Sequence, residues 1–257
     1  MSEPRVVVIT GGASGMGRGT GEVFAAGGDR VVLADINSNL GRRAAEEIEG
    51  IGGRVVFHDL DVTDEGSINE LVEWTESEVG PIDVLVNSAG ILQNPMSITE
   101  MSMEDHDRMW DINNRGLYMC CRAVAPLMKD RGWGSIVNIA SSTSFNAWPL
   151  TAYVPGKTAV KMLTEVLAGE MGPSGVRVNA VAPHVTPTPA IQARIDAGER
   201  DPAKITAQQA LPRMVEVIDV AEAIHFLCSP EAKAITGVTL PVDCGYLVAN
   251  TYNAYPK

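Results

Sequence analysis

Short apolar runs alternate with helix-length segments along almost the whole chain, and this alternation restricts the fold more than any other feature of the sequence. Each run is largely β-branched, which is typical of strands covered on both faces. The runs are Val6–Ile9, Val31–Ala34, Val55–Phe57, Val84–Val86, Ile136–Ile139, Val178–Val181 and Val238–Leu240. The segments between them include Leu40–Ile51, Glu65–Val79, Tyr118–Lys129, Thr158–Met171 and Val217–Cys228. Strand–helix–strand repetition predicts an α/β fold, a doubly wound, Rossmann-like sheet of seven parallel strands with helices on both faces.

No linker, repeat or low-complexity block interrupts this pattern, so residues 1–257 are predicted to form a single domain. The exception is the segment from Pro183 to about Leu211, which begins Pro-His-Val-Thr-Pro-Thr-Pro and continues as a charged helical stretch. Because it follows the sixth strand, it lies at the carboxyl edge of the predicted sheet. We interpret residues 183–211 as a small lid over a binding site, and a surface insertion without function is the alternative.

The charge balance and the cysteines restrict the classes of partner. A formal net charge of −12 argues against binding to a nucleic-acid backbone or an anionic membrane, so a small molecule is the expected partner. The four cysteines contain no C-x-x-C pair and are interpreted as reduced and buried. Neither a secretory signal nor a membrane-spanning apolar stretch is present, which predicts a cytoplasmic protein. His58, His106 and His225 lack paired ligand spacing, so no metal site is expected.

A glycine-rich turn follows the first predicted strand and reads Thr10-Gly11-Gly12-Ala13-Ser14-Gly15-Met16-Gly17. Glycines let the backbone turn tightly and approach a ligand without a Cβ in the way. The helix that follows would present free N–H groups and the positive end of its dipole to a pyrophosphate. The turn therefore indicates a dinucleotide site, although structural turns also use glycine.

Asp35 ends the second predicted strand. A carboxylate at this position can accept both ribose hydroxyls of an adenosine and would repel a 2′-phosphate. The nearby Ala13, Ser14, Ile36 and Asn37 carry no positive charge that would offset this repulsion. The sequence thus favours NAD(H) over NADP(H), and a helix cap before Asn37 is the structural alternative for Asp35.

The spacing Gly-x-x-x-Gly-x-Gly resembles that of the short-chain dehydrogenase/reductase superfamily, and the resemblance extends from Arg5 to about Leu247. Asn87-Ser88-Ala89-Gly90 is similar to the family's Asn-Asn-Ala-Gly, with Ser88 in place of the second asparagine. Asp61 and Val62 would flank the adenine, and the segment after Pro183 would contact the nicotinamide carboxamide. The resemblance implies a cofactor site formed by Gly11, Ser14, Gly15, Met16, Gly17, Asp35, Ile36, Asp61, Val62, Asn87, Ala89, Gly90, Tyr153, Lys157, Pro183, Thr186 and Thr188.

Tyr153 and Lys157 are four residues apart, so on a helix they share one face. A free phenol has a pKa of about 10, and a nearby ammonium and an oxidised nicotinamide ring both favour the phenolate. Such a pair gains meaning from its position directly after the fifth predicted strand. By resemblance, Tyr153 is the acid/base, and Lys157 also holds the nicotinamide ribose.

Two more residues complete a tetrad by resemblance. The strand Gly134–Ser141 is similar to the family strand that ends in its catalytic serine, so Ser141 would orient the substrate oxygen, with Ser142 as the alternative. Asn113 begins Asn113-Asn114-Arg115-Gly116, which matches the family's Asn-x-x-Gly, and would hold a water that relays protons to the lysine.

Several departures from the family pattern give further expectations. His184 replaces the usual glycine after Pro183 and either reaches the substrate or the nicotinamide, or packs as a neutral ring. Pro155 belongs in the first turn of a helix, which suggests a helix start near Thr151 with that residue as the N-cap. Cys244 stands where the family has glycine and is expected to alter local packing only.

These motifs predict an NAD(H)-dependent oxidoreductase that interconverts a secondary alcohol and a ketone, and the family implies a homotetramer. Phe145, Trp148, Pro149, Met96 and the stretch 189–191 suggest a pocket for an uncharged cyclic, aryl-alkyl or steroid-like substrate, although the same side chains could be core. The alternatives are a 3-oxoacyl carrier-protein reductase, a polyol or sugar dehydrogenase, and an NAD-binding sensor or scaffold without turnover.

Overall fold

The computed structural model describes residues 4–252 and confirms the predicted architecture. All seven strands are parallel, in the order β3-β2-β1-β4-β5-β6-β7. They are β1 (Val6–Thr10), β2 (Arg30–Asp35), β3 (Arg54–Asp59), β4 (Ile82–Asn87), β5 (Gly134–Ile139), β6 (Val176–Pro183) and β7 (Thr239–Val242). The order reverses between β1 and β4, which is the crevice where doubly wound sheets bind their ligands.

Ten α-helices occur within residues 4–252. They are α1 (Gly15–Ala26), α2 (Ser38–Glu49), α3 (Glu65–Trp74), α4 (Met103–Trp110), α5 (Leu117–Arg131), α6 (Tyr153–Met171), α7 (Pro189–Asp196), α8 (Pro202–Thr206), α9 (Val217–Cys228) and α10 (Tyr246–Tyr252). Two π-helical segments, Thr75–Val79 and Asp111–Gly116, continue α3 and connect α4 to α5. No helix in this part of the chain combines the length and apolarity needed to cross a membrane.

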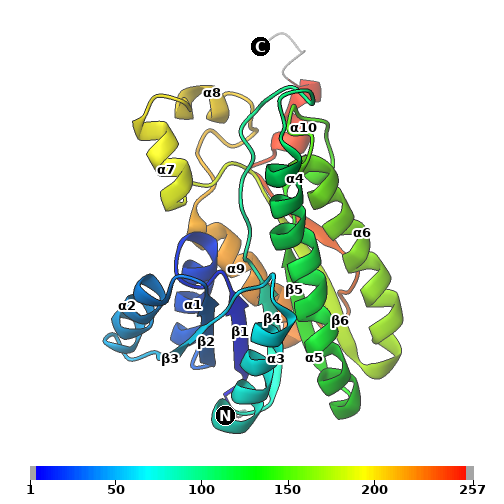
Figure 1. Cartoon of the computed structure of the whole chain (residues 1–257). Coiled ribbons are helices and arrows are strands. Elements are labelled where there is room, and N and C mark those ends of the chain that lie inside the picture. Colours follow the sequence, from blue (N-terminus) through cyan, green and yellow to red (C-terminus); the bar gives the residue numbers. More distant parts are fainter. Residues whose placement is uncertain (1–3, 253–257) are drawn as a thin grey trace.

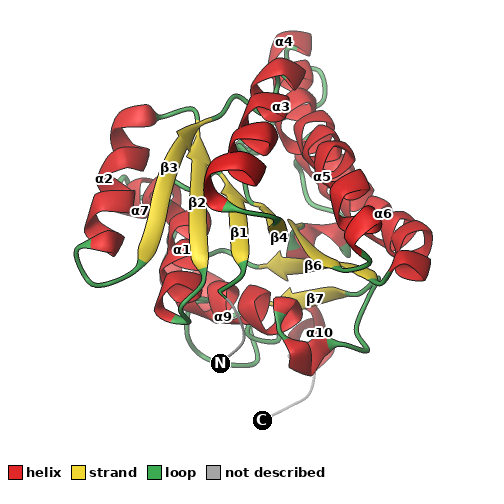
Figure 2. Ribbon diagram, turned by 90° about the horizontal axis from the view of Figure 1, so that it is seen from below, coloured by secondary structure: helices red, strands yellow, loops and turns green. Residues whose placement is uncertain are grey.

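The helices cover the two faces of the sheet and enclose a separate core on each (Figure 2). Alternate residues of β1 show the division, because Val8 packs with α3, α5 and α6 whereas Val7 and Ile9 pack with α1, α2 and α9. Figure 1 shows α7, α8 and α10 gathered at one end of the molecule and the N-terminus at the other. The segment predicted as a lid therefore contains two short helices, α7 and α8.

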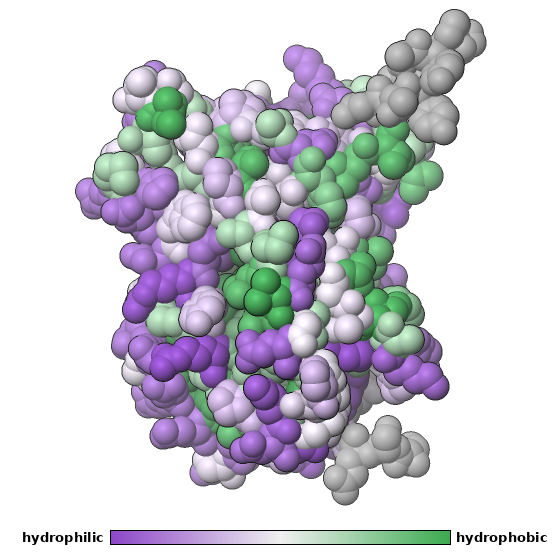
Figure 3. All heavy atoms as spheres, turned by 90° about the vertical axis from the view of Figure 1, so that its right-hand side faces the viewer, coloured by the Kyte–Doolittle hydropathy of each residue, from purple (hydrophilic) through white to green (hydrophobic). Residues whose placement is uncertain are grey.

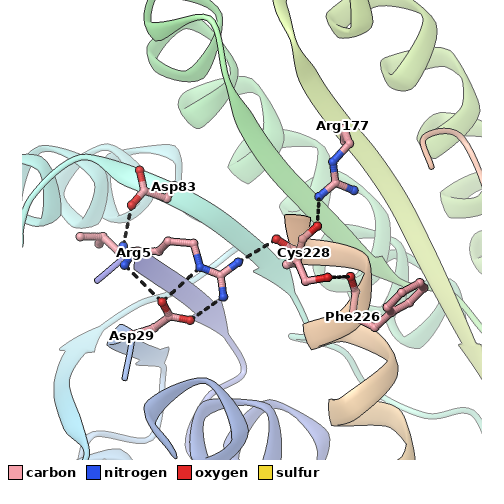
Figure 4. A network of polar contacts seen from close by, with 8 residues as sticks. Arg5, Asp29, Asp83, Arg177, Phe226 and Cys228 are labelled. Atoms are coloured by element: carbon pink, nitrogen blue, oxygen red, sulfur yellow. Dashed lines mark hydrogen bonds and ion pairs between the residues drawn. The ribbon is translucent and has the colours of Figure 1, made fainter. Parts of the chain in front are cut away.

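A polar network braces the amino edge of the sheet (Figure 4). The Arg5 guanidinium donates to both carboxylate oxygens of Asp29, at 3.1 and 2.6 Å, and to the Cys228 carbonyl at 2.7 Å. Arg177 donates to the carbonyls of Leu227 and Ser229. The two cations thus satisfy carbonyls at the end of α9, where the helix dipole is negative.

Candidate active site

The glycine-rich turn between β1 and α1 leaves no room for side chains. Gly11 and Gly15 have φ angles of +68° and +54°, which L-residues rarely adopt. A Cβ on Gly17 would lie 2.1 Å from the Gly11 carbonyl oxygen. The first turn of α1 holds no acidic residue, and the Ser14 side chain makes no capping bond with the described residues. The N–H groups in the first turn of α1 are therefore available to an anionic ligand.

Asp35 lies at the carboxyl end of β2, facing the glycine-rich turn. Its carboxylate accepts from the Ala13 N–H at 3.1 Å and from the Asn37 N–H at 2.9 Å. Asn37, rather than Asp35, caps α2 by accepting from the Leu40 N–H. Asp35 thus ties two loops together at the rim of a cavity that it also lines.

A cavity of about 600 Å³ runs along the carboxyl edge of the sheet, within the size range of ligand sites. Its wall contains most of the residues predicted for the cofactor and three of the four predicted for catalysis. Those residues are Gly11, Ser14, Gly15, Met16, Gly17, Asp35, Ile36, Asp61, Val62, Ala89, Gly90, Ser141, Tyr153, Lys157, Pro183, Thr186 and Thr188. The bare glycine turn and the acidic rim at Asp35 fit a dinucleotide.

Asn87 and Asn113 do not line this cavity. The buried Asn87 amide donates to Asn138 Oδ1 at 2.9 Å and to Cys121 Sγ at 3.2 Å, so its side chain joins β4 to β5 and α5. The turn after β4 is instead held by Thr10, whose hydroxyl accepts from the Ser88 and Ala89 N–H groups. The Asn87 side chain therefore has a structural role within the core, away from the cavity wall.

Tyr153 and Lys157 share one face of α6, as their spacing predicts. Lys157 Nζ lies 5.8 Å from the centroid of the Tyr153 ring and donates to the Ile139 carbonyl at 2.6 Å. The lysine is only 5% exposed, and burial lowers its pKa to about 8. Burial raises the pKa of Tyr153, while hydrogen bonding to Ser141 lowers it. A phenol and a buried ammonium therefore lie close together in the wall of the cavity.

The two candidate serines have different partners. Ser141 interacts with Tyr153 and accepts from the Thr143 hydroxyl at 2.9 Å. Ser142 Oγ forms a hydrogen bond with His184 Nδ1 at 3.0 Å. This geometry favours Ser141 over Ser142 as the residue next to the reacting oxygen.

Asn113 lies in the π-helical segment and is buried. Its side chain accepts from the Ile91 N–H at 2.8 Å and donates to the Ile91 carbonyl at 2.9 Å. A Cβ on Gly90 would lie 3.1 Å from Asn113 Oδ1 and 3.9 Å from Lys157 Nζ, so both groups border the same glycine. Asn114 has a different role, because it donates to the Gly156 carbonyl on α6.

His184 lines the cavity and also packs as a buried ring. It stacks on Tyr246, with ring centroids 4.0 Å apart and planes 10° from parallel. Burial lowers the pKa of His184 to about 4, so the ring is neutral at physiological pH. Its bond to Ser142 fixes the strand end beside Ser141.

The start of α6 differs from the prediction. The helix begins at Tyr153 with Ala152 as the N-cap, so Thr151 is not the cap. Ala152 has no side-chain acceptor for the free N–H groups of the first turn. Gln93, from the loop after β4, supplies the acceptor instead. Pro155 does lie in the first turn, where its missing N–H removes no helical hydrogen bond.

The cavity wall is more polar than the predicted apolar pocket. Trp148 and residues 189–191 line it, whereas Met96, Phe145 and Pro149 do not. The lining polar side chains that the motifs did not indicate are Gln93, Arg108, Thr143, Arg194 and Arg200. They lie in loops, on the short α4 or within residues 183–211, outside any motif. The one sequence feature that they share is that each follows the end of a strand, on the side of the sheet where the carboxyl ends of the strands lie.

Comparison with known proteins gives matches over nearly the whole chain. A family model described as enoyl-(acyl carrier protein) reductase matches residues 11–247. Cyclopentanol dehydrogenase from Comamonas testosteroni is 37% identical, with 94% of this chain and 96% of that protein covered. For 2-(R)-hydroxypropyl-CoM dehydrogenase from Xanthobacter autotrophicus the values are 37%, 94% and 98%. For (+)-borneol dehydrogenase 2 from Salvia officinalis they are 35%, 96% and 90%.

Solved structures agree with this fold. One described as ribose-5-phosphate isomerase from Brucella melitensis has a TM-score of 0.92 at 40% identity, covering 99% of this chain and 96% of that one. ElxO with NADP bound has a TM-score of 0.90 at 33% identity, with coverages of 95% and 99%. A 3-ketoacyl-(acyl-carrier-protein) reductase from Brucella melitensis in complex with NADH has 0.88 at 34%, with 95% and 98%. Similar chains thus hold NADP or NADH.

Proposed function

Because the chain belongs to the short-chain dehydrogenase/reductase family, we propose that it is an NAD(H)-dependent dehydrogenase of uncharged cyclic secondary alcohols. It is an oxidoreductase that acts on CH–OH groups, interconverts a secondary alcohol and a ketone, and uses a nicotinamide coenzyme. The observation that carries the proposal is that Tyr153, Lys157 and Ser141 lie together in the wall of the cavity that the glycine-rich turn also lines.

The proposed roles follow from these positions. When bound, a nicotinamide coenzyme supplies the hydride chemistry: its ring is the hydride acceptor in alcohol oxidation and the hydride donor in ketone reduction. During oxidation, the Tyr153 phenolate takes the hydroxyl proton, and Ser141 Oγ donates a hydrogen bond to the substrate oxygen. The Lys157 ammonium stabilises the phenolate. Asn113 holds the segment at Ile91 and Gly90 in place, and we retain its proposed contact to a relay water.

A substrate panel tests this function. We expect NAD⁺-dependent oxidation of cyclopentanol, cyclohexanol, borneol and 1-phenylethanol at alkaline pH, followed as NADH absorbance. Because Arg108, Arg194 and Arg200 also line the cavity, the panel includes an anionic alcohol, 3-hydroxycyclopentanecarboxylate. A preference for this anion would contradict the uncharged substrate class. Turnover of acetoacetyl thioesters alone would favour the carrier-protein reductase, and NADH binding without any turnover would favour the sensor.

Asp35 provides a test of coenzyme choice. We expect the wild type to prefer NAD⁺ over NADP⁺ by about a hundredfold or more in kcat/KM, because the carboxylate accepts ribose hydroxyls and repels a 2′-phosphate. Asp35→Asn keeps an acceptor oxygen but removes the charge, and should narrow this ratio by about tenfold or more. Asp59→Asn is the control, since Asp59 pairs with Asp35 in the strand register but is exposed. An unchanged ratio in Asp35→Asn would show that another group selects the coenzyme.

We further propose that residues 183–211 act as a lid, within one catalytic domain that spans 1–257. Residues 189–191 of α7 line the cavity, which supports this role. A homotetramer, implied by the family, gains support from the face that carries α6, where apolar side chains lie among charged ones (Figure 3). Met162 and Val166 of this helix are both more than half exposed. The free cysteines agree with the proposed cytoplasmic location.

A further inference from the structure

Gln93 occupies a position that no motif predicted. It lies in the loop after β4, two residues beyond Ile91, and is 4% exposed. Gln93 is one of the residues that line the cavity, as are Tyr153, Trp148 and Leu150. A buried amide in an irregular loop is unusual, because each of its polar atoms must find a partner to offset the cost of desolvation.

One end of this amide is fully used. Gln93 Oε1 accepts from the Ala152 N–H at 3.0 Å and from the Tyr153 N–H at 2.9 Å. An amide nitrogen cannot accept these bonds, so the two backbone donors determine which end of the side chain is oxygen. The Gln93 carbonyl is therefore the cap of α6 and holds the residue that carries the phenol.

The other end of the amide has no partner. Gln93 Nε2 is buried and makes no hydrogen bond with any residue in 4–252. Leaving both N–H donors of a buried amide unsatisfied is costly, and Gln93 is one of the residues that line the cavity. A ligand oxygen in the cavity would satisfy a donor at this place.

The loop that carries Gln93 is also rigidly held. Asn113 binds the Ile91 backbone through two hydrogen bonds, at 2.8 and 2.9 Å. Hydrogen bonds therefore connect Asn113 to the Ile91 backbone, and the Gln93 amide to the Tyr153 backbone. Ile91 and Gln93 are two residues apart in the same loop, so this loop links the two sets of bonds. A donor mounted on this frame is preorganised, so its hydrogen bond to a substrate would require little reordering.

We propose that Gln93 is a positioning and specificity-determining residue: its carbonyl fixes the start of α6, and its Nε2 donates to a second oxygen of the substrate. The substrate class is then a secondary alcohol that carries another hydrogen-bond acceptor near the carbinol, such as an ether, a carbonyl or a second hydroxyl. This inference rests on the proposed alcohol dehydrogenase function and narrows its substrate.

A matched pair of alcohols tests the donor. Cyclopentanol and tetrahydrofuran-3-ol have nearly the same shape, but only the second has a ring oxygen, which accepts and cannot donate. 2-Methoxycyclopentanol places the acceptor elsewhere. For each enzyme the measured quantity is the ratio of kcat/KM for an oxygen-bearing alcohol to that for cyclopentanol. Comparing this ratio between variants cancels differences in intrinsic reactivity.

Two variants separate the roles of the amide. Gln93→Glu keeps an oxygen that can cap α6 but cannot donate, whereas Gln93→Leu removes both functions. We expect the kcat/KM ratio for at least one oxygen-bearing alcohol to fall about tenfold or more in both variants. Both variants lack the N–H donor, so the second oxygen of the substrate no longer gains a hydrogen bond that cyclopentanol cannot make. Gln93→Glu should also recover most of the kcat on cyclopentanol that Gln93→Leu loses. Asn94→Leu, at the exposed neighbouring position, is the control.

Ratios that stay unchanged in Gln93→Leu for both oxygen-bearing alcohols would overturn the substrate contact. A Gln93→Glu enzyme as slow as Gln93→Leu would overturn the capping role. If the wild type oxidises none of the alcohols, the proposed function fails separately. In that case the substrate contact is tested by calorimetric titration of the same alcohols into the enzyme–NADH complex. The ratio of the affinity for an oxygen-bearing alcohol to that for cyclopentanol must be about tenfold higher in the wild type than in the Gln93 variants.

Discussion

Tyr153→Phe is expected to lower kcat for alcohol oxidation by about a thousandfold or more. The substitution removes only the hydroxyl, which is the group proposed to take the substrate proton, and general acid–base catalysis contributes about 10²–10⁴-fold. The ring should keep its place, because Gln93 holds the Tyr153 backbone and α6 stays intact. NADH affinity, measured by fluorescence titration, should therefore change less than about fivefold.

A second tyrosine provides the matched control. Tyr118 on α5 is half exposed, and Tyr118→Phe should retain wild-type kcat and NADH affinity. A Tyr153→Phe enzyme with more than about a tenth of wild-type kcat would show that another group moves the proton. His184 would not be the obvious replacement, because burial holds its pKa near 4.

Lys157→Met is expected to stabilise the fold while it lowers kcat/KM by about a hundredfold or more. Methionine fills a similar volume without a charge, so the phenolate loses its counter-ion and the acid limb of the pH–kcat profile should move upward. Burial without a carboxylate partner lowers the pKa of Lys157 from 10.5 to about 8. The folded state therefore binds this proton less tightly than the unfolded state, and the difference is about 3 kcal/mol of destabilisation.

The sign of this effect sets its pH window. At pH 7 the lysine is protonated in both states, so the wild type bears the full penalty and Lys157→Met should unfold at higher urea concentration. Between about pH 8 and 10.5 the folded lysine loses its proton first, and wild-type stability rises with pH relative to the variant. Above about pH 10.5 the lysine is neutral in both the folded and the unfolded state, so Lys157→Met should no longer be more stable than the wild type. Lys161→Met, one turn further along α6, is the control, since Lys161 pairs with Glu165. A Lys157→Met protein less stable at pH 7 would contradict the assigned burial penalty.

The fold follows from the sequence pattern because parallel strands covered on both faces must be apolar throughout. Each run of β-branched residues became a strand, and Val217–Cys228 became α9 with the predicted bounds. The helix α4 was not predicted, because only Met109 is buried in it and no apolar stripe marks its face. Cys244 has a φ of +51°, a conformation that explains why a glycine is usual there.

The motif positions also predicted most of the residues that line the cavity. The tetrad and the glycine turn depend on short spacings next to strand ends, which local geometry preserves. Gln93 could not be predicted in the same way, because its contacts with Ala152 and Tyr153 join residues about 60 positions apart. The polar lining at Arg108, Arg194 and Arg200 likewise depends on how α4 and the lid fold back over the sheet. Such contacts are set by tertiary packing and leave no local pattern.

The hydrogen-bonded network of Arg5, Asp29 and the end of α9 lies at the edge of the sheet opposite the cavity. Substitutions that are far apart and share no partners act almost independently on stability. Mutations in the lid or in the loop after β4 can therefore change which molecule enters the cavity without loosening this anchor. Relatives at 35–37% identity are named for molecules as different as cyclopentanol and borneol. Separating the anchor from the chemistry leaves such a scaffold free to evolve new specificities.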